Sequence, residues 1–317
     1  MGLNLIMPHQ HIPVSAIKLS IYSDPCCGKS TLGLAGQDIL MLDADLGSHR
    51  VDLQLRRSPI QRIENWMQIS FLTEQDLKPF KIIVFDTAQR ILDSIKTHLA
   101  KDQNNVIRST GNLKLHVQQQ ANNTFQTFIN KLISWNKDIV FLSHVLEVKS
   151  DEDKPAYKCP DIGGKNKQEI YRMADCMAYM TWAGTPDNPT RRLLNFETGK
   201  ADYHSKDCAN LGNIELPDLM QNPNFLSDLI EKIKTKLNEI PPEVREATRI
   251  QQEWEHWEKI CNEARYASEF NTLKQTLEDQ KDHANFRNMW ICLCNCAKAM
   301  NMSYDDEKKK WFETEVK

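Results

Sequence analysis

Between residues 15 and 220, short apolar runs alternate with longer amphipathic stretches. The apolar runs predict strands, because β-branched and aromatic residues in short unbroken runs suit a buried strand. These strands are expected at residues 17–22, 38–42, 66–71, 81–85, 138–143, 177–182 and 192–196. The amphipathic stretches predict helices at residues 29–35, 88–101, 122–135 and 167–175. Alternating strands and helices are typical of an α/β domain with a mostly parallel sheet.

Prolines mark the end of this pattern. Pro217, Pro223 and the pair Pro241-Pro242 occur close together, and no Gly or Pro follows Pro242. Beyond that point apolar residues such as Trp254, Trp257 and Ile260 recur at helical spacing. The sequence therefore predicts an α/β domain over residues 1–220, a linker over 221–242 and a small all-helical C-terminal domain over 243–317.

Composition and charge narrow the class of protein. The chain has 40 Lys+Arg against 43 Asp+Glu, a net charge of −3, which gives no overall basic footprint for nucleic acid. No stretch approaches the ~20 consecutive apolar residues that cross a bilayer. The first residues lack a basic segment followed by an apolar one, so no secretory signal is expected. We therefore expect a cytoplasmic protein without a membrane partner.

The nine cysteines are scattered rather than paired at regular spacings. A chain of this length and composition is not a small disulfide scaffold. Cys292, Cys294 and Cys296 fall in a helical stretch, where alternate residues point in different directions. We expect reduced thiols and no metal site at these three residues.

A phosphate-binding loop follows the first predicted strand. Residues 23–31 read Ser-Asp-Pro-Cys-Cys-Gly-Lys-Ser-Thr, which matches the P-loop pattern except that Ser23 replaces the first Gly. Backbone amides here and at the new helix N-terminus form a nest for phosphate, Lys29 reaches the β- and γ-phosphates, and Ser30 completes a Mg²⁺ shell. The residues expected to cradle ATP are Asp24, Pro25, Cys26, Cys27, Gly28, Lys29, Ser30 and Thr31.

Acids end two further apolar runs. Residues 81–87, Lys-Ile-Ile-Val-Phe-Asp-Thr, resemble a Walker B strand, so Asp86 is expected on the metal side of the site. The run at 39–45 ends in Asp43-Ala44-Asp45. Parallel strands deliver their carboxyl ends to one crevice, where a carboxylate can orient the attacking water. We favour Asp45 over Asp43 for this role, with helix capping or a loop contact as the alternative.

The run at 139–144 ends in Ser143-His144 at the same predicted edge. His144 is expected to contact the γ-phosphate as a third catalytic residue beside Lys29 and Asp45, although a purely structural histidine remains open.

The order of these elements resembles the RecA core: a P-loop, Asp-Ala-Asp where RecA-like proteins carry Asp-Ala-Glu, a Walker B strand, and a strand ending Ser-His. Gly163-Gly164-Lys165-Asn166 also resembles the end of that family's second DNA-binding loop. The resemblance covers residues 15–215 and is nearest to phage RecA-like ATPases of single-strand annealing and recombination. It implies a RecA-like P-loop NTPase core that uses ATP and Mg²⁺. Asp45 is one methylene shorter than Glu, which bears on the hydrolysis rate.

The resemblance implies two loops facing single-stranded DNA. Residues 102–120 offer Arg108, Lys114 and His116; residues 147–167 offer Lys149, Lys154, Tyr157, Lys158, Lys165 and Lys167. Lysines contact phosphates and an aromatic ring stacks on bases, but solvated loop lysines are the plain alternative. The resemblance also implies a homo-oligomer or filament in which Lys200 and Lys206 reach the neighbouring subunit's nucleotide.

These observations predict a DNA-stimulated, Mg²⁺-dependent ATPase acting on single-stranded DNA in phage recombination or annealing, located in the host cytoplasm. The tryptophans of the C-terminal helices are expected in its core, or on a docking face for a single-strand-binding protein. The alternatives are a nucleotide-gated interaction protein and a small-molecule kinase. The kinase is disfavoured because the only arginine pair after the core strands, Arg191-Arg192, precedes a strand instead of forming a lid.

Overall fold

The computed structural model describes residues 6, 11–149, 156–163, 165–200 and 202–314, and the side chain of residue 165 is not described. The chain divides into two compact units. One is residues 14–238, called the core unit here, and the other joins residues 239–317 with 1–13. Each unit is considered separately.

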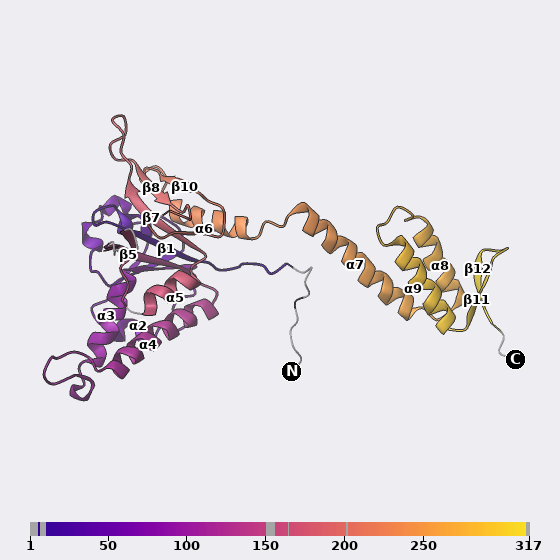
Figure 1. Ribbon diagram of the computed structural model, residues 1–317, viewed down its shortest axis with the longest axis horizontal. Helices are drawn as coiled ribbons and strands as arrows, with labels where there is room; N and C mark the ends of the chain where they lie inside the picture. Colours follow the sequence, from indigo (N-terminus) through magenta and orange to yellow (C-terminus); the bar gives the residue numbers. More distant parts are fainter. Residues whose placement is uncertain (1–5, 7–10, 150–155, 164, 201, 315–317) are drawn as a thin grey trace. The chain divides into compact units, whose positions relative to one another are not determined.

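A mostly parallel sheet forms the centre of the core unit (Figure 1). Its strand order is β10-β8-β7-β1-β5-β4-β2-β3, and the five strands β7, β1, β5, β4 and β2 pair in parallel, as does β3 with β2. The bounds are β1 (Lys18–Ser23), β2 (Ile39–Asp43), β3 (Ile60–Arg62), β4 (Ile82–Asp86), β5 (Asp138–Val148), β7 (Cys176–Trp182), β8 (Arg192–Asn195) and β10 (Asn213–Leu216). Two more strands, β6 (Tyr157–Pro160) and β9 (Lys206–Asp207), pair with β5 and β7.

Helices cover both faces of this sheet because its strands are apolar on both sides. Along β4, Ile82 and Val84 pack into one core cluster, and Ile83 and Phe85 pack into the other, as the two-residue period of a strand requires. The helices are α1 (Lys29–Gly33), α2 (Met67–Ser70), α3 (Ala88–Leu99), α4 (Leu115–Ser134), α5 (Lys165–Met173) and α6 (Phe225–Leu237), with short 3-10 turns η1 (Ser48–Arg50), η2 (Leu53–Leu55) and η3 (Gln103–Asn105). The structure therefore confirms the predicted α/β P-loop core.

Two predicted elements are wrong. The run at residues 66–71 is not a strand but the helical turn α2, with Trp66 and Ile69 buried three residues apart. A short apolar run fits a buried helix turn as well as a strand, and only the neighbouring elements decide between them. The predicted linker 221–242 contains α6, whose Leu226, Leu229 and Ile230 are buried in the core.

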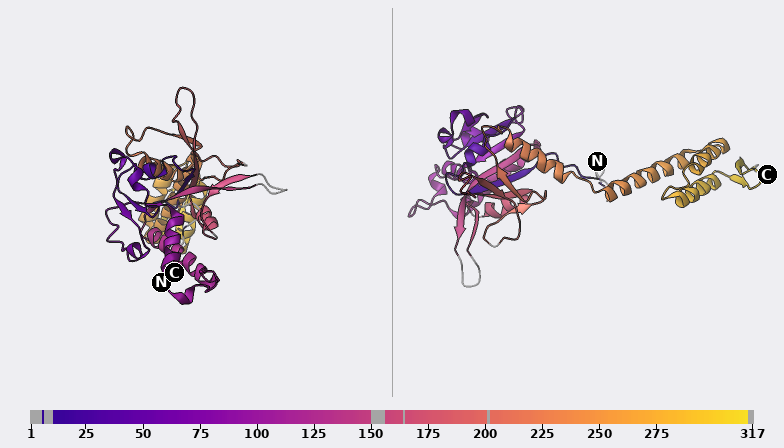
Figure 2. Two further views of the ribbon diagram at one scale, coloured as in Figure 1. Left: turned by 90° about the vertical axis from the view of Figure 1, so that its left-hand side faces the viewer. Right: turned by 90° about the horizontal axis from the view of Figure 1, so that it is seen from above.

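The two polar stretches are also more regular than the sequence indicates. Helix α4 begins at Leu115, so the first stretch is a loop only up to Lys114. In the second stretch β5 runs on to Val148 and pairs antiparallel with β6, from Val145 opposite Pro160 to Val148 opposite Tyr157. We call these paired strands, Val145–Val148 and Tyr157–Pro160, the β5–β6 hairpin. Both views of Figure 2 show it projecting from the body of the core unit.

The sequence predicts an all-helical C-terminal domain, but the structure of the C-terminal unit also contains two strands. Helices α7 (Pro242–Glu263), α8 (Ala267–Glu278) and α9 (Phe286–Ala299) are followed by a small antiparallel pair, β11 (Met302–Asp305) and β12 (Lys310–Glu313). Trp257 and Trp311 are buried in its core, and Trp254 and Trp290 pack against it. The indole of Trp257 donates to the Met289 carbonyl at 2.8 Å. These four tryptophans are core residues.

The cysteines and the described helices bear on disulfides, metal sites and membrane spans. All nine cysteines are free thiols. Within the described part of the chain, no group of three or more His, Cys, Asp or Glu side chains could hold a metal ion. Of the helices described, none has the length and apolar character needed to span a bilayer.

Candidate functional site

The phosphate loop connects β1 to α1 at the carboxyl edge of the sheet. Its left-handed positions are Cys26, with φ of 64°, and Gly28, with φ of 90°. Ser23 is the last residue of β1 and is not among the left-handed positions, so the missing first glycine imposes no backbone strain there. The left-handed φ of Gly28 favours glycine at this position, and a Cβ there would also displace the flexible guanidinium of Arg192.

Lys29 is buried in the loop that it is expected to serve. Its ammonium donates to the carbonyl and hydroxyl oxygens of Ser23, both at 3.0 Å, and to the Asp24 carbonyl at 3.1 Å. Burial lowers the pKa of Lys29, since the charged form is desolvated. Ser23 therefore supplies an extra acceptor, its hydroxyl, that the usual glycine lacks. Phosphate oxygens would compete for these same donors.

Asp86 ends β4 beside the phosphate loop, with its side chain buried. Burial raises its pKa to about 6, and a hydrogen bond with Ser30 opposes that rise. Among the described residues, its Oδ2 atom has no hydrogen-bond partner. Mg²⁺ in nucleotide sites is held by one or two carboxylates, phosphates and waters. An unpartnered carboxylate oxygen beside a hydroxyl fits that ion, so Asp86 and Ser30 are suited to hold it.

The two acids after β2 have different surroundings. Asp43 is fully buried, and its two carboxylate oxygens each accept a backbone amide at 3.1 Å, from Gly47 and from Ser48. Asp45 instead lines the cavity in front of the phosphate loop and faces Arg90 at 3.4 Å and Arg50 at 3.9 Å. Asp43 therefore holds the loop after β2, and Asp45 is the acid available to a ligand.

His144 lies on β5 directly opposite Ser23 in the parallel register. The side chain is half-buried, and within the described structure its Nδ1 atom has no hydrogen-bond partner. Burial lowers the pKa of His144, and the neighbouring charge of Lys29 lowers it further. A neutral imidazole at neutral pH is the result, able to donate one hydrogen bond without adding charge.

These groups surround one cavity of about 350 Å³. Its lining includes most of the predicted phosphate cradle and the two acids and the histidine predicted from the later strands, Asp45, Asp86 and His144. The complete lining is Pro25, Cys26, Gly28, Lys29, Ser30, Thr31, Asp45, Gly47, Arg50, Val51, Asp86 and His144. Two predicted cradle residues face elsewhere. Cys27 is buried, and the Asp24 carboxylate accepts a hydrogen bond from Tyr179 at 3.0 Å.

Sequence reasoning missed three arginines at this site. Arg50 lines the cavity and Arg90 pairs with Asp45. Arg192, at the start of β8, donates from Nη1 to the Cys27 carbonyl at 3.0 Å, and its guanidinium lies 5.5 Å from the Trp182 ring centroid. No local pattern marks these residues, because strand pairing, the loop after β2 and the start of α3 bring them to the site.

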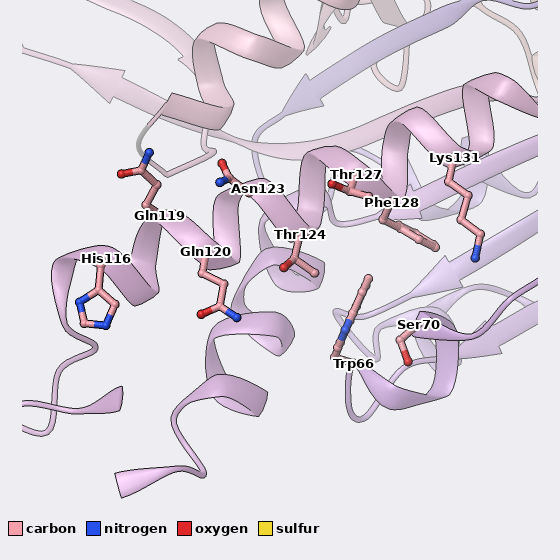
Figure 3. Close-up of a pocket in the computed structure, with 10 residues that line it drawn as sticks. All are labelled: Trp66, Ser70, His116, Gln119, Gln120, Asn123, Thr124, Thr127, Phe128 and Lys131. Atoms are coloured by element: carbon pink, nitrogen blue, oxygen red, sulfur yellow. The ribbon is translucent and has the colours of Figure 1, made fainter. Parts of the chain in front are cut away.

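A larger hollow of about 720 Å³ lies along α4, away from the phosphate loop (Figure 3). Amides and hydroxyls line it, with Trp66, Phe128, His116 and Lys131, and none of the described residues that line it carries a carboxylate. The Lys131 ammonium donates to the Leu72 carbonyl at 2.7 Å. This hollow lacks the acid and anion nest that a magnesium nucleotide needs.

The predicted DNA-contacting residues are dispersed around the β5–β6 hairpin. Lys149 is exposed just after β5. Tyr157 stacks on His204 with ring centroids 4.5 Å apart, and Lys167 lies 5.8 Å from the Tyr157 ring centroid. The Lys158 ammonium donates to the Tyr179 hydroxyl at 2.9 Å. Lys154 and the side chain of Lys165 lie outside the described structure.

The two lysines predicted to act on a neighbouring subunit have local contacts. Lys200 pairs with Glu197 at 3.0 Å and is exposed. Lys206 donates to the Arg172 carbonyl at 3.0 Å, near the end of α5. In the first predicted loop, Arg108 is exposed, Lys114 precedes α4, and His116 lies in its first turn.

The buried charge of Asp86 leads to a stability prediction. Its pKa of about 6 lies above the ordinary 3.8, so the folded state binds this proton more tightly than the unfolded state does. Folding stability therefore falls as pH rises from about 4 to 6 and is level above that range. Asp86→Asn should stabilise the nucleotide-free protein by on the order of 2–3 kcal/mol at pH 7.5, and by little near pH 4. Urea unfolding at several pH values measures this difference, and a variant less stable than wild type at pH 7.5 would contradict it.

The match to one protein family agrees with this geometry. The family described as AAA domain matches residues 15–207, which contain the phosphate loop, Asp45, Asp86 and His144. No curated protein matches the chain. Among solved structures, the RadB recombinase is 10% identical, with 56% of this chain and 79% of that chain covered and a TM-score of 0.31. A prototypical ATPase from the type III secretion system of pathogenic bacteria is 12% identical, with 89% of this chain and 81% of that chain covered and a TM-score of 0.34.

The family match spans more than half of the chain and lies over the unit that carries the cavity. A phosphate loop between β1 and α1, with an acid at the end of β4, is the arrangement that binds a nucleoside triphosphate. The chain therefore belongs to the AAA domain family, and its core unit is a P-loop domain built to bind a nucleoside triphosphate.

Proposed function

We propose that the protein is a Mg²⁺-dependent ATPase that acts on single-stranded DNA, in phage recombination or strand annealing. The observation that carries the ATPase part is the single cavity on which Lys29, Ser30, Asp86, Asp45 and His144 converge. An anion nest, a buried carboxylate with an unpartnered oxygen and a second acid at the cavity wall are the groups that phosphoryl transfer requires.

Each residue has a distinct task in this proposal. Mg²⁺, when bound by Ser30 and Asp86, supplies positive charge to the phosphates. Lys29 exchanges its contacts with Ser23 and Asp24 for phosphate oxygens. Asp45 orients a water molecule, and for this it must release Arg90, a partly solvated contact at 3.4 Å that costs little to break. The neutral His144 donates a hydrogen bond on the γ-phosphate side.

The DNA part of the proposal is supported by the β5–β6 hairpin. It projects from the core unit (Figure 2), and the far end of its paired strands carries Lys149, just after β5, and Tyr157, whose ring stacks on His204 with Lys167 beside it. Cations beside aromatic faces suit a strand whose phosphates need charge and whose bases need stacking surfaces. A cytoplasmic location, a homo-oligomer or filament and a single-strand-binding protein as partner belong to the same proposal. In such an oligomer, Lys200 and Lys206 would leave their present contacts for the neighbour's nucleotide.

One experiment tests this function. ATP hydrolysis is measured with Mg²⁺, with and without single-stranded DNA, at two salt concentrations. We expect hydrolysis that needs Mg²⁺ and rises with DNA, and a rise that weakens at the higher salt because phosphate contacts release counterions. Hydrolysis that is indifferent to DNA at both salts would contradict the DNA part and favour a nucleotide-gated interaction protein.

The salt dependence can be assigned to particular lysines. Replacing Lys149 and Lys167 together by Ala should weaken DNA binding and reduce the slope of log K against log salt by about 1.4, since each phosphate contact on a single strand contributes about 0.7. Fluorescence anisotropy with a labelled oligonucleotide measures both quantities. The control pair Lys78→Ala and Lys232→Ala removes two exposed lysines elsewhere in the core unit and should leave the slope unchanged. An unchanged slope in the first pair would show that these lysines are only solvated.

A further inference from the structure

A chain of side-chain hydrogen bonds joins the phosphate loop to the β5–β6 hairpin. The Tyr179 hydroxyl on β7 donates to Oδ2 of Asp24 in the phosphate loop at 3.0 Å. The Lys158 ammonium on β6 donates to the same hydroxyl at 2.9 Å. One phenolic oxygen therefore stands between a residue of the nucleotide loop and a residue of the hairpin.

Tyr179 is held firmly in this position. Its side chain is buried, its ring stacks on Tyr22 with centroids 5.1 Å apart, and the ring of Tyr203 lies 5.6 Å away. The Lys158 ammonium lies 5.2 Å from the Tyr179 ring centroid. A close-packed ring cannot absorb a shift at one end of the chain by turning freely. A displacement of Asp24 therefore shifts the Tyr179 hydroxyl and changes its contact with Lys158, and a displacement of Lys158 changes the contact with Asp24 in the same way.

The nucleotide has a direct means of moving Asp24. In the present structure Lys29 donates to the Asp24 carbonyl at 3.1 Å and to both oxygens of Ser23. Bound phosphates would draw these donors away, and their negative charge would repel the Asp24 carboxylate. Asp24 therefore has different contacts in the nucleotide-free and nucleotide-bound states, as a switch between two arrangements requires.

The hairpin has an equally direct means of acting on Lys158. The phosphate of a single strand and the Tyr179 hydroxyl compete for the same ammonium group. Withdrawing Lys158 leaves the Tyr179 hydroxyl with the Asp24 carboxylate as its only hydrogen-bond partner among the described residues. The sequence predicts that Lys158 contacts DNA, and the structure shows that it is also linked to the nucleotide site, through the Tyr179 hydroxyl and Asp24.

We propose that Tyr179 is a positioning residue that couples nucleotide occupancy of the phosphate loop to the β5–β6 hairpin, and through Lys158 to an anionic strand bound there. The nucleotide half stands on the chain of contacts alone, and the DNA half rests on the proposed function. Because coupling is reciprocal, nucleotide and DNA should change each other's affinity by the same factor.

A second contact offers a competing route between the two regions. The Gly163 amide donates to Oε1 of Gln89 at 2.6 Å, and Gln89 lies on α3, three residues after Asp86. A signal from the metal side of the site could reach the segment after β6 through this bond. The two routes separate experimentally because they share no side chain.

The test is hydrogen exchange of the β5 and β6 amides, with and without a saturating non-hydrolysable ATP analogue and Mg²⁺. In the wild type we expect the analogue to change hairpin exchange rates by about fivefold or more, the lower range of allosteric coupling. Tyr179→Phe should remove most of this nucleotide-dependent change. The matched control Tyr203→Phe removes a phenolic oxygen from the same aromatic cluster but not from the hydrogen-bond chain. This variant should keep the nucleotide-dependent change in exchange.

The comparison of two states separates coupling from a merely structural role, which would alter exchange equally with and without nucleotide. Asp24→Ala breaks the chain at its other end and should act like Tyr179→Phe, whereas Asp24→Asn keeps an acceptor oxygen and should retain the coupling. The inference is overturned if the nucleotide-dependent change persists in Tyr179→Phe, or is lost only in Gln89→Ala.

The DNA half has its own measurement. Oligonucleotide affinity is determined with and without the analogue for the wild type and Tyr179→Phe. We expect a nucleotide-dependent difference of about fivefold or more in the wild type, reduced toward none in the variant. No DNA binding by either protein would remove the proposed DNA function, while the exchange experiment would still decide the coupling between nucleotide and hairpin. Equal coupling in both proteins would overturn the inference with the DNA function intact.

Discussion

Lys29→Ala should abolish tight ATP binding. The ammonium group can give up to three charge-assisted hydrogen bonds, which at present go to Ser23 and Asp24. Each hydrogen bond to a charged group is worth about 1.5–3 kcal/mol, so losing two of them from phosphate weakens binding by about 10²-fold or more. Isothermal titration with Mg²⁺-ATP measures the loss directly.

The fold should survive this change. Removing the buried ammonium relieves its desolvation, which lowers its pKa, and this offsets the loss of its contacts with Ser23 and Asp24. Thermal unfolding should therefore stay near the wild-type midpoint, while the upward shift that saturating ATP causes in the wild type disappears. Lys81→Ala, at an exposed lysine that pairs with Asp38, is the control and should keep both affinity and shift. Unchanged ATP affinity in Lys29→Ala would remove the phosphate-loop assignment.

Asp45→Asn should keep nucleotide affinity and cut ATP turnover by roughly 10²-fold or more, the usual scale for losing a general base. An amide retains the shape of the carboxylate and still accepts a hydrogen bond from Arg90, but it cannot take a proton from water. Single-turnover hydrolysis together with nucleotide affinity separates the two effects. Normal turnover would exclude Asp45 from water activation.

Asp43→Asn is the matched control, two residues away. Asp43 accepts backbone amides from Gly47 and Ser48, one on each oxygen, and an asparagine has only one acceptor. We expect a stability loss of about 1–3 kcal/mol from the unsatisfied buried amide, with turnover per folded molecule near normal. The reverse result, a turnover loss in Asp43→Asn with Asp45→Asn near normal, would exchange the roles of the two acids.

The sequence by itself determined the features that depend on neighbouring residues. Residues 23–31 build the phosphate loop because its backbone amides, its glycine and its lysine are local to one turn between a strand and a helix. The acids at the ends of β2 and β4 are equally local, since a parallel strand that ends in an acid places it at the carboxyl edge. The buried β-strands were predictable because both faces are apolar.

The tertiary structure decided everything that depends on what a segment packs against. The run at Trp66 became a helical turn because its buried positions are three residues apart, and the polar stretch after Glu147 became a strand because β5 and β6 pair. The local sequence does not determine either outcome, since a short apolar or polar run is compatible with several secondary structures.

The same holds within the site. Only the loop after β2 distinguishes the two acids. The amides of Gly47 and Ser48 hold Asp43, whereas Asp45 faces the cavity and the side chains of Arg50 and Arg90. Only strand pairing brings Arg192 to the phosphate loop and places Tyr179 between Asp24 and Lys158, residues that are 134 positions apart in the sequence. Contacts across a sheet depend on register and order of strands, and these arise from the packing of the whole core rather than from any one segment.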